Sequence, residues 1–305
     1  MTTYTLTHAQ VTWVNIVGTT EEDLAELARL YPQFHPLNLH DCLAQLEYPK
    51  VDHHDDYLFL IMHFPVFEKR QRLSVANEVD IFIAGGLLVT AHQGQLKPLV
   101  ELFDACTQDP AAREQYMGHG ASPLMHVVID RLVNYCFPIV AKVDSQIYHI
   151  EENLFADRPR HILEEIAVVR RDLIALRRII RPQHDVLCAL EEGKWPWIQE
   201  ELDIYWRDIR DRLRQLRAML DEDAEVLDGL SSTIDTLASH RIDEVVRWLT
   251  IATIVTLPLM LLFTLYSMNV HIPYEEHPIT FFGVLAVGLL ITGAVLWLLK
   301  RRDWL

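Results

Sequence analysis

The chain has 305 residues, half of them hydrophobic, and a formal net charge of −16 at pH 7. The acidic excess belongs to residues 1–247, because acidic and basic side chains are equal in number from Trp248 onward. An acidic surface of this size repels polynucleotides and attracts cations, so we expect no nucleic-acid partner.

Cysteine spacing and the N-terminus narrow the class of protein further. The four cysteines lie far apart without a CxxC pair, which favours small buried thiols over a zinc site or a disulfide framework. The segment MTTYTLTHAQ lacks a basic n-region and an apolar h-region, so we expect no signal peptide. P-loop, nucleophile-elbow and GxGxxG motifs are absent, which argues against ATP-driven transport and against hydrolysis.

Residues 1–123 have the pattern of an α/β domain. The runs VTWVNIV, DYLFLIMHFPVF and EVDIFIAGGLLVTAH are rich in β-forming residues and are bounded by Gly, Pro or Asp, which predicts strands. Between the first two runs, Thr19 or Thr20 is a candidate N-cap for a helix with Leu24, Leu27 and Leu30 on one face. The segment HHDD, residues 53–56, is open to a metal-site interpretation, but a solvated loop is favoured because metal sites need converging ligands.

Residues 124–247 predict long helices. Apolar residues recur at steps of three and four, which is typical of a heptad-like seam. The first helix carries the seam Ile129, Leu132, Cys136, Ile139, Val143, Ile147, Ile150 and Leu154. A second helix follows with a predicted kink at Pro182. A third seam contains Ile209, Leu213, Leu216, Leu220, Leu227, Ile234 and Leu237. The third helix is predicted from Trp197 to Tyr266, about 105 Å at 1.5 Å per residue, and enters an apolar run.

Residues 248–305 predict a membrane hairpin. Trp248–Tyr266 and Ile279–Leu299 carry no charged side chain, and each is long enough to cross about 30 Å of hydrocarbon as a helix. Basic residues flank the two spans on the outer sides of the pair, at 241, 247 and 300–302, whereas the loop at 267–278 has no Lys or Arg. By the positive-inside rule, both termini and the basic tail are cytoplasmic and the loop is external. A buried hairpin in a soluble core is the alternative.

Two spans per chain cannot enclose an aqueous path, so a pore requires a ring of several copies. The first span suits the pore-lining position, because its hydroxyl side chains are able to face water or, alternatively, to bond their own helix carbonyls. These hydroxyls belong to Thr250, Thr253, Thr256, Thr264 and Ser267. The second span is more uniformly apolar and suits an outer ring, where Gly283, Gly288 and Gly293 permit close helix contact.

The C-terminal sequence resembles one family of membrane proteins. WLTIATIVTLPLMLLFTLYSMNV, then IPYEE, then a second span ending KRRDWL, is similar to the CorA family of magnesium transporters, also called 2-TM-GxN. Upstream, FHPLNLHDCL, YPKVDHHDDYLFLIM, LLVTAHQG and YWRDIRDRL resemble the cytoplasmic part of that family in order and spacing. The resemblance implies an α+β cytoplasmic domain with long stalk helices, followed by a two-helix transmembrane hairpin. It also implies a funnel-shaped homopentamer through which ions enter passively, driven by membrane potential.

The family signature is Gly-Met-Asn, or Gly-Ile-Asn in the ZntB branch, whereas this chain has Ser267-Met268-Asn269. The resemblance places Asn269 in a ring at the outer pore mouth, where neutral oxygens hold the hydration shell of Mg²⁺ without trapping the ion. A helix C-cap is the alternative role for Asn269. Serine adds a hydroxymethyl group and disfavours positive φ, so we expect a differently shaped pore mouth and weaker or less selective Mg²⁺ conduction. Glu275 and Glu276, repeated around a ring, concentrate divalent cations above it.

Further positions follow from the resemblance. Val246 and Leu249 match the apolar gate, and Asp243 stands where the family has Asn near the cytoplasmic pore entrance. Asp208 matches a stalk acid that binds regulatory Mg²⁺ between protomers, with Glu68 as a guess for its partner. A solvated acid near several arginines is an equal alternative for Asp208.

The leading hypothesis is therefore a homopentameric Mg²⁺ channel, multi-pass in the cytoplasmic membrane, with Mg²⁺ as cargo and as a possible regulatory ligand. Its partners are its own copies, the lipid bilayer and divalent cations, and no enzymatic step is expected. A zinc or broad-specificity divalent-cation transporter is the alternative, since loop histidines 271 and 277 would favour softer metals if they are not merely solvated. A non-conducting membrane scaffold or regulator of this family is the third.

Overall fold

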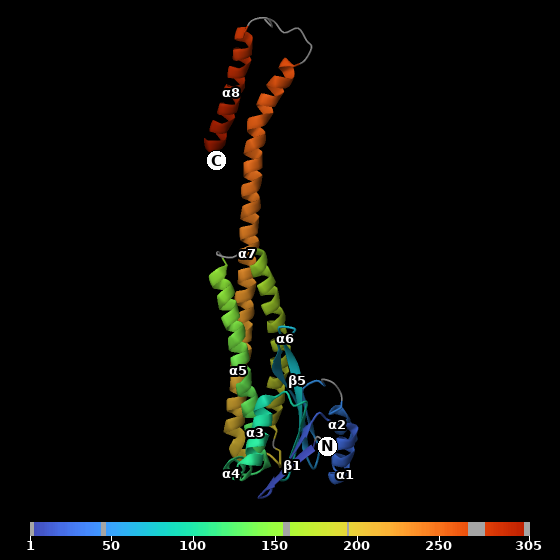
Figure 1. Cartoon of the computed structure of the whole chain (residues 1–305). Helices are drawn as coiled ribbons and strands as arrows, with labels where there is room; N and C mark the ends of the chain where they lie inside the picture. The colour runs from blue at the N-terminus through green and yellow to red at the C-terminus, as the bar shows by residue number, and fades with distance from the viewer. Residues whose placement is uncertain (1–2, 44–46, 155–158, 194, 268–277, 302–305) are drawn as a thin grey trace. The chain divides into compact units, whose positions relative to one another are not determined.

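A computed structural model describes residues 3–43, 47–154, 159–193, 195–267 and 278–301. The chain forms two compact units, Met1–Ser231 (unit 1) and Ser232–Leu305 (unit 2). Unit 1 combines one β-sheet with helices, and unit 2 is helical in the residues described (Figure 1). The expected α+β domain, long helices and apolar C-terminal helices are all present.

The sheet of unit 1 has six strands in the order β1-β2-β6-β5-β4-β3. Neighbouring strands are antiparallel except β2 and β6, which are parallel. The strands are β1 (Thr3–His8), β2 (Val11–Val17), β3 (Lys50–His53), β4 (Leu58–Glu68), β5 (Leu73–Ala84) and β6 (Leu87–His92). The three apolar runs of the sequence correspond to β2, to β4, and to β5 and β6 together, so the strand predictions are confirmed.

A glycine turn divides the third apolar run into two strands. Gly86 has φ +77°, a backbone conformation that side chains with a Cβ disfavour. A Cβ at Gly86 would also lie 2.5 Å from the backbone oxygen of Gln10. The Gly86 carbonyl accepts a 2.8 Å hydrogen bond from the Thr12 amide, which joins this turn to the start of β2.

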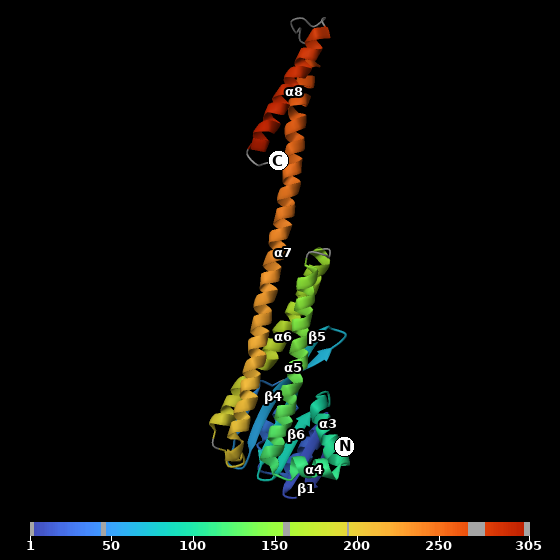
Figure 2. The ribbon, with the colours of Figure 1, turned by 90° about the vertical axis from the view of Figure 1, so that its left-hand side faces the viewer.

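Helices cover both faces of the sheet (Figures 1 and 2). On one face, α1 (Glu21–Leu30) and α2 (Pro36–Asp41) pack on a core that includes Ile16, Phe59 and Phe82. On the other face lie α5 and α6. The remaining helices of the chain are α3 (Lys97–Gln108), α4 (Pro110–Met117), α5 (Ala121–Asn153), α6 (Pro159–Glu192), a 3-10 turn (Glu200–Leu202), α7 (Asp203–Tyr266) and α8 (Pro278–Arg301).

The predicted start of α1 is confirmed. Thr20 and Asp23 form a capping box in which each side chain accepts from the other residue's backbone N–H, at 3.3 and 3.2 Å. Leu24 and Leu27 are buried as expected. Leu30, which the pattern placed on the same face as these two leucines, is 56% exposed. The helix ends at this residue, beyond the surface that covers the sheet.

The long helices agree with the predicted seams, with two corrections. In α5, Val140 rather than Ile139 is fully buried, directly after Pro138 within the helix. The helix predicted from Trp197 begins instead at Asp203, because a turn and a 3-10 segment occupy the residues before it. The second helix continues through Pro182 as α6.

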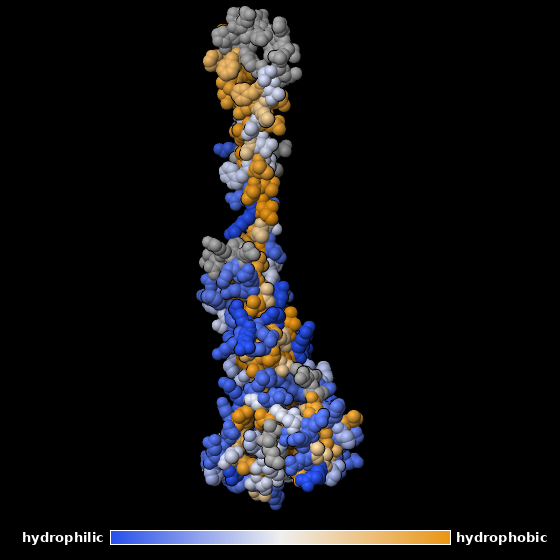
Figure 3. Space-filling view, turned by 45° about the vertical axis from the view of Figure 1, so that its right-hand side comes forward, coloured by the Kyte–Doolittle hydropathy of each residue, from blue (hydrophilic) through white to orange (hydrophobic). Residues whose placement is uncertain are grey.

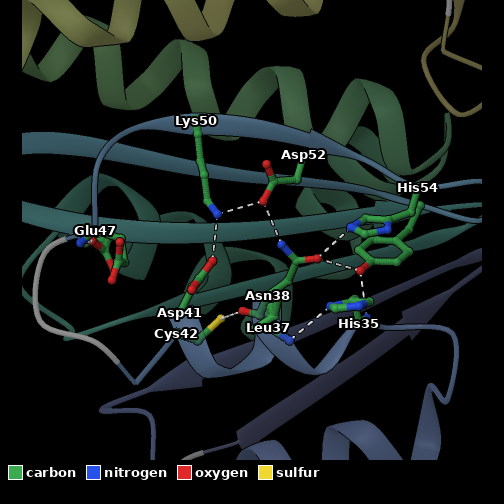
Figure 4. A network of polar contacts seen from close by, with 11 residues as sticks. His35, Leu37, Asn38, Asp41, Cys42, Glu47, Lys50, Asp52 and His54 are labelled. Carbon is green, nitrogen blue, oxygen red and sulfur yellow. Dashed lines mark hydrogen bonds and ion pairs between the residues drawn. The ribbon is translucent and has the colours of Figure 1, made fainter.

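A polar network joins α2 to the edge of the sheet (Figure 4). The buried Asn38 amide donates to Asp52 at 2.8 Å and accepts from Tyr57 and His54 at 2.8 and 2.7 Å. Lys50 lies 2.8 Å from the carboxylates of both Asp41 and Asp52. The 53–56 loop is therefore less solvated than predicted at His54, although Asp55 and Asp56 are exposed. Among the residues described, no group of three or more His, Cys, Asp or Glu side chains is placed to hold a metal ion.

A second polar chain is buried in the middle of the sheet. Trp13 Nε1 donates to Thr90 Oγ1, which donates to Asn15 Oδ1, at 3.0 and 2.8 Å. His92 Nδ1 accepts from the Gly94 amide at 2.9 Å, so its proton lies on Nε2, which donates to Asn15 at 3.0 Å. His92 is 3% exposed. Burial lowers the pKa of His92 to about 4, and the ring is neutral in the folded protein.

This burial predicts acid sensitivity of the fold. Because the folded pKa of His92 lies below its ordinary value near 6.5, the folded state resists protonation. Its contribution to stability is complete above about pH 6.5 and is lost as pH falls toward 4, by up to about 3 kcal/mol. His92→Gln should show a smaller loss of melting temperature than the wild type between pH 7 and 4.5, measured on the full chain in detergent. The exposed His240→Gln is the control and should follow the wild type.

Candidate functional site

Three helices of the described chain are long and apolar enough to cross a membrane: Ala121–Asn153, Asp203–Thr264 and Phe281–Arg301. The first is α5, which lies against β4, β5 and β6 and buries its apolar face in the core of unit 1. The apolar segments of α7 and α8 bury almost nothing within the chain, and orange, hydrophobic side chains cover them (Figure 3). Exposed apolar surface of this extent requires lipid or other copies of the chain. The two predicted spans are thus the apolar helices that remain almost unburied in the described chain.

Within unit 2, α7 and α8 pack closely at one glycine. A Cβ at Gly288 would lie 2.5 Å from Leu262 Cδ1 and 3.6 Å from Leu259 Cδ2, so a larger residue requires the Leu262 side chain to move. A small apolar hollow beside it is lined by Leu259, Leu262, Phe263, Phe281, Val284 and Leu285. Gly283 and Gly293 have no such neighbour within the chain. Of the three predicted contact glycines, only Gly288 makes the contact in a single chain.

The threonines of the first span bond their own helix. Their hydroxyls donate to carbonyls four residues earlier, from Thr250, Thr253, Thr256 and Thr264 at 2.8, 2.9, 2.7 and 2.6 Å. The alternative of carbonyl bonding is therefore realised; Thr253, Thr256 and Thr264 remain exposed and Thr250 is half-buried. An open hollow on this surface of α7 is lined by Thr256, Leu259, Met260, Phe263, Thr264 and Ser267. A hydroxyl that donates within its helix still has lone pairs free to accept from water.

The predicted gate positions lie on successive turns of α7. Val246 and Leu249 are 53% and 67% exposed, and Asp243 is exposed. Two large apolar side chains turned outward next to an acid are costly in a single chain in water. They are available for contacts with other copies.

Of the signature triplet, the structure describes only the serine. Ser267 is exposed and its amide donates to the Phe263 carbonyl at 3.0 Å, which continues the helical pattern. The described non-glycine residues with positive φ are Ala9 and Arg72, so Ser267 does not adopt the positive φ that serine disfavours. The other predicted residues here, Met268, Asn269, Glu275 and Glu276, lie outside the described residues.

The two acids predicted to bind regulatory Mg²⁺ each have another partner. Asp208 Oδ2 lies 2.6 Å from Arg212 Nη2, and the same Arg212 nitrogen lies 2.5 Å from Asp130. Glu68, at the end of β4, accepts from Gln71 at 2.7 Å. The structure therefore does not bring Asp208 and Glu68 together through any contact within the described part of one chain. Asp208 and Arg212 are four residues apart on α7, so their pairing agrees with the alternative of an acid near several arginines, whereas the contact of Arg212 with Asp130 depends on the packing of α5 against α7.

Comparisons with known proteins agree with this architecture. The family model described as "CorA-like Mg2+ transporter protein" matches residues 8–301. The chain is 25% identical over 96% of its length, and 83% of the relative, to the cobalt/magnesium transport protein CorA of Thermotoga maritima. It is 28% identical over 74% of its length, and 68% of the relative, to the zinc transport protein ZntB of Pectobacterium atrosepticum. The complete structure of the CorA magnesium transporter from Methanocaldococcus jannaschii has the same fold, with a TM-score of 0.84 at 20% identity over 98% of this chain and 93% of that one.

The packing at Gly288 predicts a position-specific effect. Gly288→Val places a side chain against Leu262 and should destabilise the hairpin by about 1–3 kcal/mol through overpacking. The matched control is Gly293→Val, on the same helix, where an added Cβ has no atom of the described chain within 4 Å. Melting temperature in detergent should fall for Gly288→Val and change less for Gly293→Val. Equal losses would mean that Gly293 also packs closely, against another copy.

Proposed function

The chain belongs to the family of CorA-like Mg²⁺ transporter proteins, a family of divalent-cation transporters, and we propose that it carries Mg²⁺ across the cytoplasmic membrane. The observation that carries the proposal is the hairpin of α7 and α8, whose long apolar segments bury almost none of their surface within one chain. Two helices cannot surround water, so the proposed pore is a homopentamer with α7 as its inner helix. Support for α7 rather than α8 comes from its threonines and from the open hollow beside Ser267.

The proposed topology follows from the charges. Residues 1–123 and 124–247 form the cytoplasmic domain and stalk, residues 248–305 form the hairpin, and the loop 267–278 is external. Both termini are cytoplasmic, because basic residues flank the pair of spans and the loop has none. The acidic loop residues Glu275 and Glu276 then attract cations to the outer mouth.

The proposed path for the ion passes from Asn269 to Asp243. Mg²⁺ loses its water reluctantly, so a ring of neutral Asn269 oxygens binds the hydration shell and not the bare ion. This contact holds the hydrated ion without trapping it, and the ion is released readily. Rings of Val246 and Leu249 close the path by dewetting. Asp243 adds a ring of carboxylates at the cytoplasmic entrance, where positive ions leave.

Zinc is the second candidate ion. The similarity to the zinc transport protein ZntB is 28% identity, slightly above the 25% shared with the Thermotoga CorA, although it covers less of both chains. Loop residues His271 and His277 would favour the softer metal. A non-conducting member of the family is a third candidate, supported by Ser267 in place of the signature glycine.

Flux in liposomes tests the function. Purified protein should admit Mg²⁺ under an inward potential, and Asn269→Ala should reduce the rate at least several-fold. Ser267→Gly should increase Mg²⁺ flux, because it removes a hydroxymethyl group from each copy at the pore mouth. Inhibition of the Mg²⁺ flux by Co²⁺, Ni²⁺ and Zn²⁺ ranks these ions by the preference of the protein for each.

The same preparation should be a pentamer by native mass spectrometry. A pentamer without flux of any divalent cation would favour the non-conducting role. Zn²⁺ flux that exceeds Mg²⁺ flux would replace the proposed ion. If Asn269→Ala leaves a measurable flux unchanged, the ion-binding ring lies elsewhere.

A regulatory role for Asp208 has a separate test. A Mg²⁺ ion between protomers must compete with Arg212, which occupies the Asp208 carboxylate in the single chain. If Mg²⁺ wins, it stabilises the closed ring by linkage, so millimolar Mg²⁺ should protect the stalk from protease. Asp208→Ala should abolish most of this protection, whereas Asp211→Ala, an exposed acid paired with Arg214 at 3.1 Å, should not. Equal protection in both variants would leave Asp208 as a surface acid.

A further inference from the structure

A hollow lies in unit 1 where the turn between β4 and β5 meets α5 and α6, and Figures 1 and 2 both show this end of β5 beside the two helices. Glu68 of β4 pairs with Leu73 of β5, so residues 69–72 form the turn. The volume of the hollow is about 290 Å³. Its lining residues are Arg72, Ser145, Gln146, His149, Ile150, Glu165 and Val169.

Arg72 has a backbone conformation that glycine would adopt more easily. Its φ is +51°, in the left-handed region, at the last position of the turn. Glycine or asparagine suits such a position, because a side chain with a Cβ raises the conformational energy there. Within the described residues, the guanidinium of Arg72 forms no ion pair and no hydrogen bond that would explain its presence. A residue kept against the backbone preference in this way indicates a role for its side chain.

Contacts with both helices fix the turn in place. Arg171 Nη2 on α6 donates to the backbone oxygen of Gln71 at 2.5 Å. Lys142 on α5 lies over the ring of Phe67, with its Nζ 3.8 Å from the ring centroid. Because the turn is fastened to α5 and to α6, Arg72 lines a hollow that is already formed, which lowers the conformational cost of binding a ligand.

The lining of the hollow combines apolar surface with unused donors. Ile150 and Val169 are 2% and 4% exposed and supply the apolar part. Arg72, Ser145 and Gln146 supply guanidinium, hydroxyl and amide donors. In the part of the chain that the structure describes, these three side chains have no hydrogen-bond partner. A guanidinium fork beside neutral donors suits a phosphate group, which offers three acceptor oxygens.

One carboxylate lines the same hollow. Glu165 on α6 lies 4.0 Å from the ring of His161, and it is the acid in this lining. A carboxylate repels a bare inorganic phosphate but accepts a hydrogen bond from a hydroxyl group. The volume of the hollow is close to the lower limit for small-molecule sites, roughly 300 Å³. These features together favour a small molecule that carries both a phosphate and a hydroxyl group.

We propose that this hollow is a binding site for a small organic phosphate. The phosphate group bonds to Arg72, with Ser145 and Gln146 as neutral donors, and a hydroxyl group of the ligand donates to Glu165. The bound molecule joins the turn to α5 and α6 of the same chain and thereby stabilises unit 1. The site shares no residue with the proposed ion path or with Asp208, and it would exist in a chain that conducts nothing.

Isothermal titration calorimetry on the full chain in detergent tests the site, in a buffer free of phosphate and of divalent cations. Glycerol 3-phosphate is the probe, because it combines a phosphate with hydroxyl groups in a small molecule. It should bind once per chain. Inorganic phosphate, glycerol and L-lactate should each bind more weakly, because the first lacks a hydroxyl donor on a carbon body, the second lacks a charge, and the third replaces phosphate by carboxylate.

Arg72→Gly separates a binding role from a structural role. Glycine adopts positive φ without strain, so the variant should fold with an unchanged or higher melting temperature. Its affinity for glycerol 3-phosphate should fall about tenfold or more, as expected for a lost hydrogen bond to a charged group. Arg70→Gly is the matched control, because Arg70 is exposed in the same turn and does not line the hollow. It removes the same charge and should keep an affinity close to that of the wild type.

Glu165→Ala tests the role of the hydroxyl group. Without this carboxylate, the affinity for inorganic phosphate should rise, and the preference for glycerol 3-phosphate over inorganic phosphate should shrink. Absence of saturable binding at millimolar glycerol 3-phosphate, or an equal loss of affinity in Arg70→Gly and Arg72→Gly, would overturn the proposal. Binding of L-lactate as tight as that of glycerol 3-phosphate would overturn the assignment to phosphates. None of these measurements involves ion flux, so a failure of transport would leave their outcomes intact.

Discussion

The structure depends on one constraint: an apolar helix must hide its whole circumference from water, and a two-helix hairpin hides only one side of each helix. In unit 2 the contact between Gly288 and Leu262 covers a single stripe of α7 and of α8. Much of the remaining apolar surface stays exposed in the described chain, with Val246 and Leu249 53% and 67% exposed. In the proposed assembly, lipid covers the outward side and further copies cover the inward side, so membrane insertion and assembly solve the same problem.

In unit 1, by contrast, an acidic sequence must hold three long helices in one arrangement. Arginines of α6 and α7 join the helices through charge pairs: Arg177 with Asp221, Arg210 with Glu191, and Arg212 with Asp130 on α5. Each exposed pair contributes little by itself, but groups shared between helices restrict the register in which the seams meet. The acids left over account for the negative net charge, and one of them, Asp223, is buried in the α7 seam at 6% exposure.

Sequence patterns predicted the strands that helices cover on both faces of the sheet. The strands β2, β4, β5 and β6 are continuous apolar runs because helices cover both faces of the sheet. The edge strands β1 and β3 were not predicted, since β1 alternates weakly and β3 has only four residues, KVDH. The start of α7 at Asp203 was missed because Trp197 and Ile198 extend the apolar pattern into a turn.

The candidate site also has a part that the sequence predicted and a part that it did not. Hydropathy alone identified the hairpin, whereas the roles of Asn269, Asp243 and Asp208 came only from family resemblance. Asp208 and Arg212 pair at i,i+4 spacing within α7, whereas the contact of Arg212 with Asp130 could not be predicted, because it depends on how α5 and α7 meet. Asp223 was visible as a step of three after Leu220, but a search for apolar residues passes over an acid in the seam.

In the proposed pore, with α7 as its inner helix, the threonine hydroxyls of α7 have a consequence for the sign of the permeating charge. Each hydroxyl of Thr250, Thr253, Thr256 and Thr264 has committed its only proton to a helix carbonyl, so toward solvent it is an acceptor alone. A hydrated cation turns the hydrogens of its water outward, and a hydrated anion turns water oxygens outward. A wall of acceptors therefore completes the outer shell of the cation and leaves that of the anion unsatisfied. Through this arrangement an uncharged helix surface discriminates between ions of opposite sign without binding either of them directly.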